Sequence, residues 1–412
     1  MRPTKLTTIH LFCDIGSAFE DKKKKGISHF LEHMLFKGTR GYTSEELLYE
    51  LDAKGGKINA YTTKRYTCFK MQMESIYFKE YIHLLSEITL HSLICEKKLG
   101  SIVRVVRSEN ESDEQNFTKN LYLAFANSAF LGSSFQDPVD SLQYHNQFSY
   151  ADLKKWYAQF YQPQNLVMSI VSSIPQSTCK SILMDSSFCK NKNTSAKMPM
   201  RYNPPYQSDS PHYILKTYSG CFTTHLRVGF RIHNQYSEDK YLFQVLCQSL
   251  NNLSGRFFLK VREEYGLTYR TFSEIELEET SGFFSVQCEM NPKYLLATFT
   301  IVVQILNGLV EEGITSKELQ AAQQHLHTNW VSDGEDNDAL SKYNGEQLFL
   351  FSNNLLPHAN LYEKYKVKKD DLNRIIHQYF LRKNFIVSIV SEKELNLLAV
   401  EKVGNGFQKI SP

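Results

Sequence analysis

Two histidines and a glutamate lie within one short apolar segment, as His29, Glu32 and His33 in the order His-x-x-Glu-His. Residues four apart on a helix share one face, so both imidazoles can reach a single cation. Glu32 would lie beside that cation, where a carboxylate can take the proton of a metal-bound water as it attacks a carbonyl. This inverted form of His-Glu-x-x-His predicts a zinc-hydrolase site with one Zn²⁺ per chain and Glu32 as general base.

An alternative interpretation of this segment is a buried amphipathic helix whose histidines only make hydrogen bonds. Its other residues are largely apolar, among them Ile27, Phe30, Leu31 and Met34. Three ionisable groups in such a helix are costly unless they are paired or bind a metal. We therefore favour metal binding, which requires a third protein ligand from elsewhere in the chain.

The third ligand is expected near the end of a helix predicted between residues 96 and 117. Continuing the apolar row of that helix reaches Glu109, and an unpaired carboxylate on an apolar face is costly unless it binds a cation. The spacing favours Glu109 without excluding its neighbours, and the helix could also simply turn polar at its end. The apolar row is Leu99, Ile102, Val103 and Val106, and the neighbouring carboxylates are Glu111, Asp113 and Glu114.

These segments resemble the pitrilysin family of zinc metallopeptidases, which includes insulin-degrading enzyme, the mitochondrial processing peptidase and small bacterial processing proteases. Residues 29–39 resemble the metal helix of that family, and residues 105–109 resemble the segment that supplies its distal glutamate ligand. The resemblance implies that His29, His33 and Glu109 hold zinc. Residues 55–67 are similar to the family's active-site strand, which implies that Asn59 and Ala60 pair with a peptide substrate.

Residues 254–269 resemble the second-half signature of the same family, in which an arginine and a tyrosine reach the substrate. Here they are Arg262 and Tyr269. Without the resemblance, this segment predicts an amphipathic helix that ends at Gly266 and leads into a strand, with Arg262 as a solvated charge. One departure is Ile102, which stands seven positions before Glu109, where the family commonly has a second glutamate.

The length of the chain and its composition predict two domains of the α+β class. We expect a catalytic zinc-binding domain at 1–175, a linker at 176–211 rich in Ser, Asn, Lys and Pro, and a second domain at 212–412. Each half opens with an alternating strand followed by a long helix, which predicts two homologous domains with mostly antiparallel sheets covered by helices. The second half lacks the paired histidines and contributes only substrate contacts.

The remaining composition limits the class of protein. The formal net charge is +3, which does not indicate binding to nucleic acid, and no segment approaches the roughly 18 apolar residues of a membrane span. The eight cysteines include no Cys-x-x-Cys, so we expect free thiols in a reducing compartment. The expected location is intracellular and soluble, in the cytoplasm or alternatively in the mitochondrial matrix.

The motif predicts a zinc-dependent endopeptidase, and the resemblance implies that it cleaves extended peptides or presequences inside a chamber. Because the family builds that chamber from four such domains, the resemblance implies a homodimer or a pair with a related subunit. One alternative is a non-catalytic scaffold or partner subunit of a processing-peptidase-like complex. Another is a zinc-sensing or storage protein, which would bind the metal without depending on Glu32.

Overall fold

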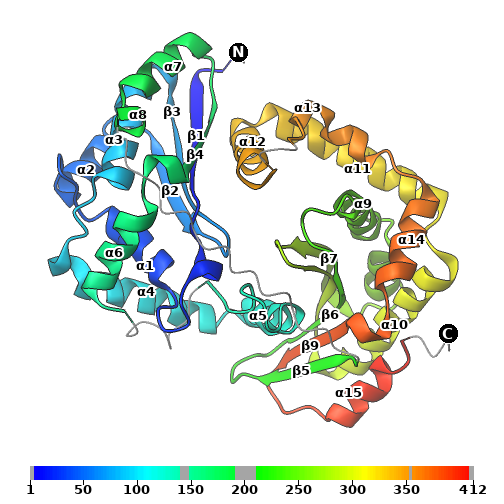
Figure 1. The fold of residues 1–412 in the computed structure, drawn as a ribbon. Coiled ribbons are helices and arrows are strands. Elements are labelled where there is room, and N and C mark those ends of the chain that lie inside the picture. The colour runs from blue at the N-terminus through cyan, green and yellow to red at the C-terminus, as the bar shows by residue number, and fades with distance from the viewer. Residues whose placement is uncertain (1–3, 140–147, 191–209, 352–354, 408–412) are drawn as a thin grey trace. The chain divides into compact units, whose positions relative to one another are not determined.

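The structure is a computed structural model that describes residues 4–139, 148–190, 210–351 and 355–407. The chain forms two compact units whose segments alternate along the sequence (Figure 1). Unit 1 contains residues 1–112, 138–201 and 331–360, and unit 2 contains residues 113–137, 202–330 and 361–412. The units differ from the predicted domains because each half of the chain gives one segment to the other unit.

Unit 1 is built on a four-stranded antiparallel sheet with the order β2-β3-β1-β4. All residues of β1 after the first are buried, because helices cover both faces of this central strand. On one face Ile9, Leu11 and Cys13 join the main core. The strands are β1 (Leu6–Cys13), β2 (Lys57–Thr62), β3 (Thr67–Glu74) and β4 (Leu166–Val171).

The helices on the Ile9 face of this sheet carry the metal-binding motif. Their apolar side chains form the core cluster with the sheet. They are α1 (Ile27–Leu35), α2 (Ser44–Asp52), α3 (Phe78–Leu90), α4 (Leu99–Glu114), α6 (Tyr150–Phe160), α7 (Gln176–Asp185) and α8 (Ser187–Lys190).

The other face of the unit 1 sheet is covered by α12 (Asn337–Phe351), which comes from the second half of the chain and contacts β1 and β4. This contact combines an apolar cluster, in which Phe349 of α12 packs against Phe12 and Tyr66, with several polar pairs. Lys70 pairs with Asp338 at 2.7 Å, the Tyr66 hydroxyl donates to Glu346 at 2.6 Å, and the Ser341 hydroxyl donates to the backbone of Ser169 at 3.1 Å.

Unit 2 contains a five-stranded sheet with the order β5-β9-β6-β8-β7, in which only the β5–β9 pair is parallel. Its first strand, β5, has no counterpart in the four-stranded sheet of unit 1 as the described residues show it. The strands are β5 (His212–Thr217), β6 (Thr224–Ile232), β7 (Thr268–Leu277), β8 (Gly282–Met290) and β9 (Phe385–Ser391).

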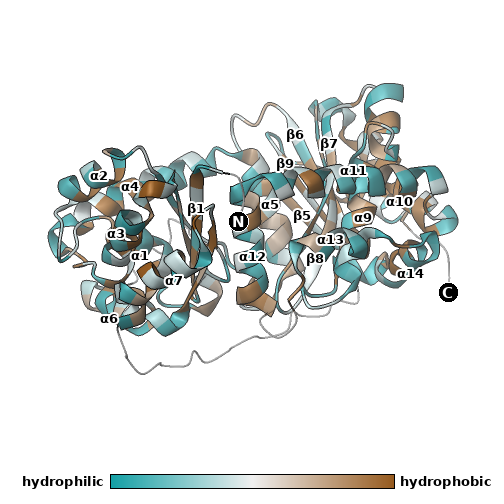
Figure 2. Ribbon diagram, turned by 90° about the horizontal axis from the view of Figure 1, so that it is seen from above, coloured by the Kyte–Doolittle hydropathy of each residue, from teal (hydrophilic) through white to brown (hydrophobic). Residues whose placement is uncertain are grey.

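Helices cover both faces of this second sheet as well. The exchanged helix α5 (Phe117–Ala129), from the first half of the chain, packs on β9 and β6. Figure 2 colours α11 mainly as hydrophilic, and Ala322 is its buried residue. The remaining helices of unit 2 are α9 (Asp239–Asn251), the π-helix η6 (Phe258–Glu264), α10 (Leu295–Glu312), α11 (Ser316–Glu335), α14 (Lys369–Tyr379) and α15 (Leu397–Gly404), while α13 (His358–Leu361) lies almost entirely in the segment that belongs to unit 1.

The predicted fold class is confirmed, with two antiparallel-rich sheets covered by helices. Helix α2 begins with a capping box, in which the Thr43 hydroxyl accepts the Glu46 N–H and the Glu46 carboxylate accepts the Thr43 N–H. The predicted linker at 176–211 is wrong at its start, because 176–190 form α7 and α8 within unit 1. Residues 191–209 lie outside the described residues.

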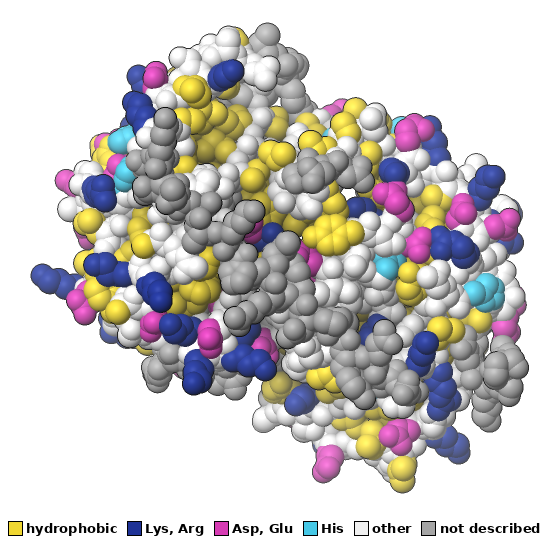
Figure 3. Space-filling view, in the orientation of Figure 1, with side chains coloured by type: hydrophobic (Ala, Val, Ile, Leu, Met, Phe, Trp, Pro, Cys, Tyr) yellow, Lys and Arg dark blue, Asp and Glu magenta, His cyan; other side chains and the backbone are white. Residues whose placement is uncertain are grey.

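The prediction that no segment approaches a membrane span is wrong by length and composition, because one helical segment of the described chain, Pro292–Glu312, is long and apolar enough to cross a bilayer. In this structure 56% of it is buried, and its apolar residues fill the core of unit 2. Positive and negative side chains are interspersed on the visible face of the molecule (Figure 3). That distribution agrees with the small net charge of +3.

Candidate metal centre

The helix that carries both histidines begins after Gly26, whose backbone adopts the left-handed conformation that favours glycine. Gly26 has φ 84° and caps α1 without a side chain of its own. Glu20 supplies the missing cap, because its two carboxylate oxygens accept the backbone N–H groups of Gly26 at 2.7 Å and Ser28 at 2.8 Å. His29 lies in the first turn of α1, so this cap fixes the backbone next to it.

The Glu20 carboxylate is buried, with 7% of its surface exposed. Burial raises the pKa of Glu20 to about 7, although the two backbone N–H donors oppose that rise. The sequence analysis did not single out Glu20. An acidic residue shortly before a helix with a glycine cap is the signal that could have found it.

The structure brings His29, His33 and Glu109 together, with one ligand atom of each within 4.8 Å of the others. The two histidine Nε2 atoms are 3.2 Å apart. Glu109 Oε2 lies 3.3 Å from Nε2 of His33 and 3.9 Å from Nε2 of His29. Two imidazole nitrogens and one carboxylate oxygen converging in this way fit a zinc ion with three protein ligands and an open fourth position.

Glu109 reaches this group from α4, but not from the buried row of that helix as the apolar spacing suggested. The buried row continues through Ile102 and Val106 to Asn110, whose side chain bonds the backbone of Val106. Glu109 lies one position aside, with 46% of its side chain exposed. The Glu109 carboxylate is therefore directed toward the two histidines and is not buried in the core. Asp113, the other carboxylate in the row, pairs with Lys119.

Glu32 lies on α1 with the two histidines and is the most buried member of the motif, with 7% exposure. Its Oε2 accepts a hydrogen bond from the hydroxyl of Thr62 at 2.6 Å. Burial raises the pKa of Glu32 above its ordinary value, and the Thr62 hydrogen bond acts in the opposite direction. Thr62 ends β2 and was not predicted. The side-chain alternation of β2 puts it on the same face as Ala60, which is the signal that could have found it.

Asn59 and Ala60 lie on β2, which is an edge strand of the unit 1 sheet. The side-chain oxygen of Asn59 accepts the N–H of Ala60 at 2.9 Å. Since β2 pairs with β3 on its other edge, the Ala60 N–H points toward the open edge of the sheet. A peptide adding as a further strand would replace the side-chain acceptor with its own carbonyl.

Arg262 and Tyr269 belong to unit 2, where the structure places them next to each other. Within residues 254–269, where the sequence predicts an amphipathic helix, the structure contains the π-helix η6. This conformation is rare and is often found at functional sites. The Arg262 guanidinium lies over the rings of Phe258 at 5.0 Å and Tyr269 at 5.9 Å. Tyr269 falls at a bulge in the edge strand β7 and is 82% exposed.

Ile102, the residue that departs from the family pattern, is 1% exposed and belongs to the main core of unit 1. A carboxylate at this position would be buried among apolar side chains. In this chain the position supports packing of α4 in the main core of unit 1.

Two family models match separate parts of the chain. The insulinase model (peptidase family M16) matches residues 1–139, and the model of the peptidase M16 inactive domain matches residues 147–326. An uncharacterized zinc protease of Bacillus subtilis, YmxG, is 25% identical over 387 residues, which cover 93% of this chain and 92% of that protein. An uncharacterized zinc protease of Mycobacterium tuberculosis is 23% identical over 383 residues, which cover 91% and 86%.

Solved structures with the same fold include a protease from Helicobacter pylori, with a TM-score of 0.87 and 20% identity, covering 94% of both chains. A second is described as a peptidase M16 inactive domain from Pseudomonas fluorescens, with a TM-score of 0.81 and 17% identity, covering 96% of this chain and 95% of that one. At these identities the likeness establishes the fold of the whole described chain.

Proposed function

Because this chain belongs to peptidase family M16, we propose that it is a zinc-dependent endopeptidase that hydrolyses extended peptides. The single observation that carries the proposal is the grouping of His29, His33 and Glu109 beside the buried carboxylate of Glu32. The relatives named as zinc proteases support a metallopeptidase. The choice of substrate and the catalytic role of each residue belong to the proposal.

In this function His29, His33 and Glu109 hold the ion. When bound, zinc polarises the scissile carbonyl and lowers the pKa of water from its usual value to about 7. Glu32 accepts the proton of the attacking water and later delivers it to the leaving amine. The hydroxyl of Thr62 holds Oε2 of Glu32 at 2.6 Å, which leaves Oε1 to exchange the proton.

The substrate aligns as an additional strand along β2, with Asn59 and Ala60 at the point of pairing. Main-chain pairing of this kind selects extended peptides and reads side chains only at alternate positions. Arg262 and Tyr269 contact the same substrate from unit 2. The stacking of Arg262 on Tyr269 supports this role, because it holds a guanidinium and a phenol together as donors for peptide carbonyls.

The proposed assembly is a chamber formed by two chains, as a homodimer or with a related subunit. The proposed location is a reducing intracellular compartment, the cytoplasm or the mitochondrial matrix. All eight cysteines are free in the structure, five of them buried, which supports a reducing compartment.

A second candidate function is that of a non-catalytic partner subunit. One solved structure with this fold is described as an inactive domain, and Ile102 occupies the position of an outer glutamate. This candidate predicts zinc binding or structural pairing without peptide cleavage.

Cleavage of a mixed peptide library by the purified chain beside its Glu32→Gln form, with zinc counted in both, tests the proposal. We expect the wild type to cut and the variant to retain zinc with a loss of at least about 100-fold in rate, as removal of a general base costs. Equal cleavage by both forms would reject Glu32 as the base. If neither form cuts while both hold zinc, the peptidase function fails for the isolated chain.

The same zinc measurement identifies the third ligand. Glu109→Ala should lower zinc affinity by more than the roughly 10–100-fold that loss of an outer hydrogen bond costs. Glu111→Ala is the matched control, because Glu111 is an exposed carboxylate on the same helix. Equal zinc retention by the two variants would remove Glu109 from the metal centre.

A further inference from the structure

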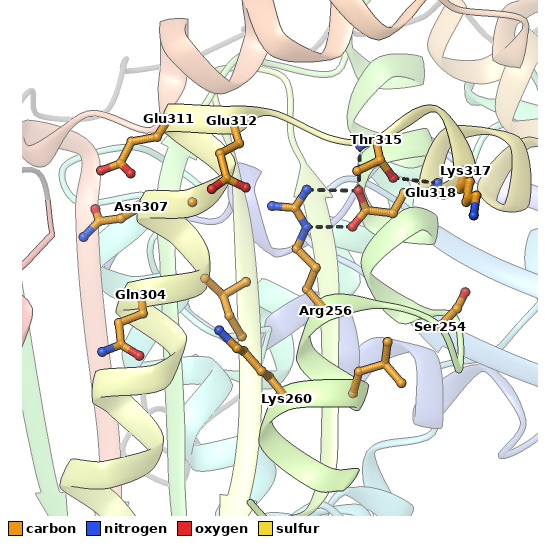
Figure 4. Close-up of a pocket in the computed structure, with 13 residues that line it drawn as sticks. Ser254, Arg256, Lys260, Gln304, Asn307, Glu311, Glu312, Thr315, Lys317 and Glu318 are labelled. Atoms are coloured by element: carbon orange, nitrogen blue, oxygen red, sulfur yellow. Dashed lines mark hydrogen bonds and ion pairs between the residues drawn. The ribbon is translucent and has the colours of Figure 1, made fainter. Parts of the chain in front are cut away.

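Unit 2 contains a hollow of about 860 Å³ between the end of α10, the start of α11 and the π-helix η6 (Figure 4). Its volume is in the ordinary range of small-ligand sites, about 300–1,000 Å³. Leu259 and Ile305 give it apolar walls, and charged side chains of both signs line the rest. None of these residues is assigned to the metal centre or to the proposed substrate contacts.

One wall of the hollow contains the guanidinium of Arg256, which hydrogen bonds fix on the side away from the hollow. Nε and Nη2 of Arg256 bind the two carboxylate oxygens of Glu318 at 2.6 and 3.0 Å, and Nη2 also donates to the carbonyl of Gly313 at 2.6 Å. Nη1 makes no hydrogen bond to any described residue, and Figure 4 shows this nitrogen directed into the space between α10 and η6. Lys260 enters the same space and makes no ion pair with the described part of the chain.

The opposite side presents carboxylates that are not neutralised. Glu311 and Glu312 end α10 and line the hollow, and neither makes an ion pair within the described residues. Figure 4 shows Glu312 facing the guanidinium of Arg256 across the gap. Opposite charges that face each other across a hollow without contact leave room for a ligand that carries both signs.

Gly308 keeps this space open. It lies in the interior of α10, where glycine is less stable than alanine. Neither its backbone nor its packing requires glycine, since its φ is not positive and an added Cβ would meet only Nη1 of Arg256 at 4.0 Å, an ordinary contact. A larger side chain at this position would occupy the volume in front of Nη1.

We propose that this hollow binds a short peptide with free ends, its α-ammonium facing Glu311 and Glu312 and its carboxylate facing Nη1 of Arg256 and Lys260. Such peptides are what an endopeptidase releases, so this identification of the ligand rests on the proposed function. Leu259 and Lys260 belong to η6, the helix that also carries Arg262. A bound peptide therefore contacts the element that holds Arg262 on Tyr269.

Calorimetric titration of trialanine with free ends into the full chain tests the proposal. The protein is the zinc-free Glu32→Gln form, so binding is measured without cleavage. We expect one peptide per chain, and affinity at least about tenfold weaker for the acetylated and amidated peptide, for Lys260→Met and for Glu312→Gln. Gly308→Leu should abolish binding by filling the hollow.

Lys393→Met and Glu394→Gln are the matched controls, because both residues are exposed in unit 2 and neither lines the hollow. The melting temperature of each variant shows that it is folded. Absence of binding to the folded Glu32→Gln protein would overturn the proposal, and so would equal binding when Lys260→Met, Gly308→Leu or the control substitutions are added to it. Peptidase activity is assayed separately. Absence of peptide binding in the hollow would leave cleavage unchanged, and absence of cleavage would leave the measured binding unchanged.

Discussion

The hydrogen bond from Thr62 to Glu32 connects the strand proposed to bind substrate with the proposed general base. Thr62 ends β2, two residues after Ala60, and its hydroxyl is 2.6 Å from Oε2 of Glu32. A peptide that adds to β2 would therefore pack next to the residue that orients the base. In the proposed function, alignment of the substrate and orientation of Glu32 therefore depend on one strand.

Replacing Thr62 with valine should lower kcat by about 10-fold while zinc content and KM change little, because the carboxylate loses the donor that fixes it but keeps its charge. Steady-state kinetics with a cleaved library peptide measure the split. Thr62→Ser, which keeps the hydroxyl, should restore most of the rate. A valine variant as fast as wild type would show that Glu32 is oriented by other groups.

At this scale the sequence identified the residues whose chemistry depends on type and short spacing. His29, Glu32 and His33 are close because one helical turn makes them close. Glu109 was expected on a buried row, yet it lies beside that row and faces the histidines from another helix. The partners Glu20 and Thr62 come from separate elements, and single-sequence spacing does not encode such distances.

The contact between α12 and the unit 1 sheet contains a histidine whose charge the fold opposes. His10 is 1% exposed, and burial lowers its pKa to about 4 although Asp338 lies 3.5 Å from Nε2. Lys70 and Lys342 lower the pKa of His10 further. The unfolded chain binds the proton near the ordinary pKa of about 6.5, so protonation favours unfolding.

The stability that neutral His10 contributes is therefore present above pH 6.5 and is lost as the pH falls from about 6.5 toward about 4. At about 1.4 kcal/mol per pKa unit, the loss is on the order of 2 to 3 kcal/mol. Urea unfolding of zinc-free protein between pH 7 and 4.5 should show a smaller pH dependence in His10→Gln than in wild type. Equal slopes would mean that His10 is not held neutral.

Elements with local signals were predicted well, and elements set by tertiary contacts were not. The Thr-x-x-Glu spacing of Thr43 and Glu46 is a local signal of this kind, because it marks the start of α2 in the sequence alone. The composition of residues 176–190 resembled a linker, yet they form α7 and α8, because apolar residues such as Ile182 and Leu183 pack on the unit 1 core. The π-helix at Arg262 has no signature that distinguishes it from an α-helix in sequence.

At the scale of the whole molecule, the two halves exchange segments. Residues 113–137 leave the first half for unit 2, and residues 331–360 leave the second half for unit 1. Each sheet thus receives the helix on its second face from the other half, α12 in unit 1 and α5 in unit 2. The sequence patterns predicted two homologous domains that follow one another along the chain, because nothing in either helix indicates which sheet it covers.

A chain ended at residue 211 retains every proposed metal ligand but lacks α12, so β1 would expose Phe12 and His10, which are buried in the whole molecule. We expect this fragment to lose a large part of the roughly 5–15 kcal/mol that stabilises an ordinary domain and to unfold without cooperativity. Circular dichroism during heating measures this. Co-expression with residues 212–412 should restore cooperative unfolding, whereas an equally stable isolated fragment would contradict the exchange.

The exchange also sets an order for events on the ribosome. The strands of unit 1 are complete once β4 has emerged at residue 171, but the helix that covers their second face ends at residue 351. At about 5–20 residues per second, synthesis of the stretch between them takes roughly 10 to 40 s. During that time the nascent chain carries both histidines and Glu109 on α1 and α4, while the second face of the sheet lacks its covering helix α12. The chain therefore completes the unit that carries His29, His33 and Glu109 only when nearly all of the polypeptide has been made.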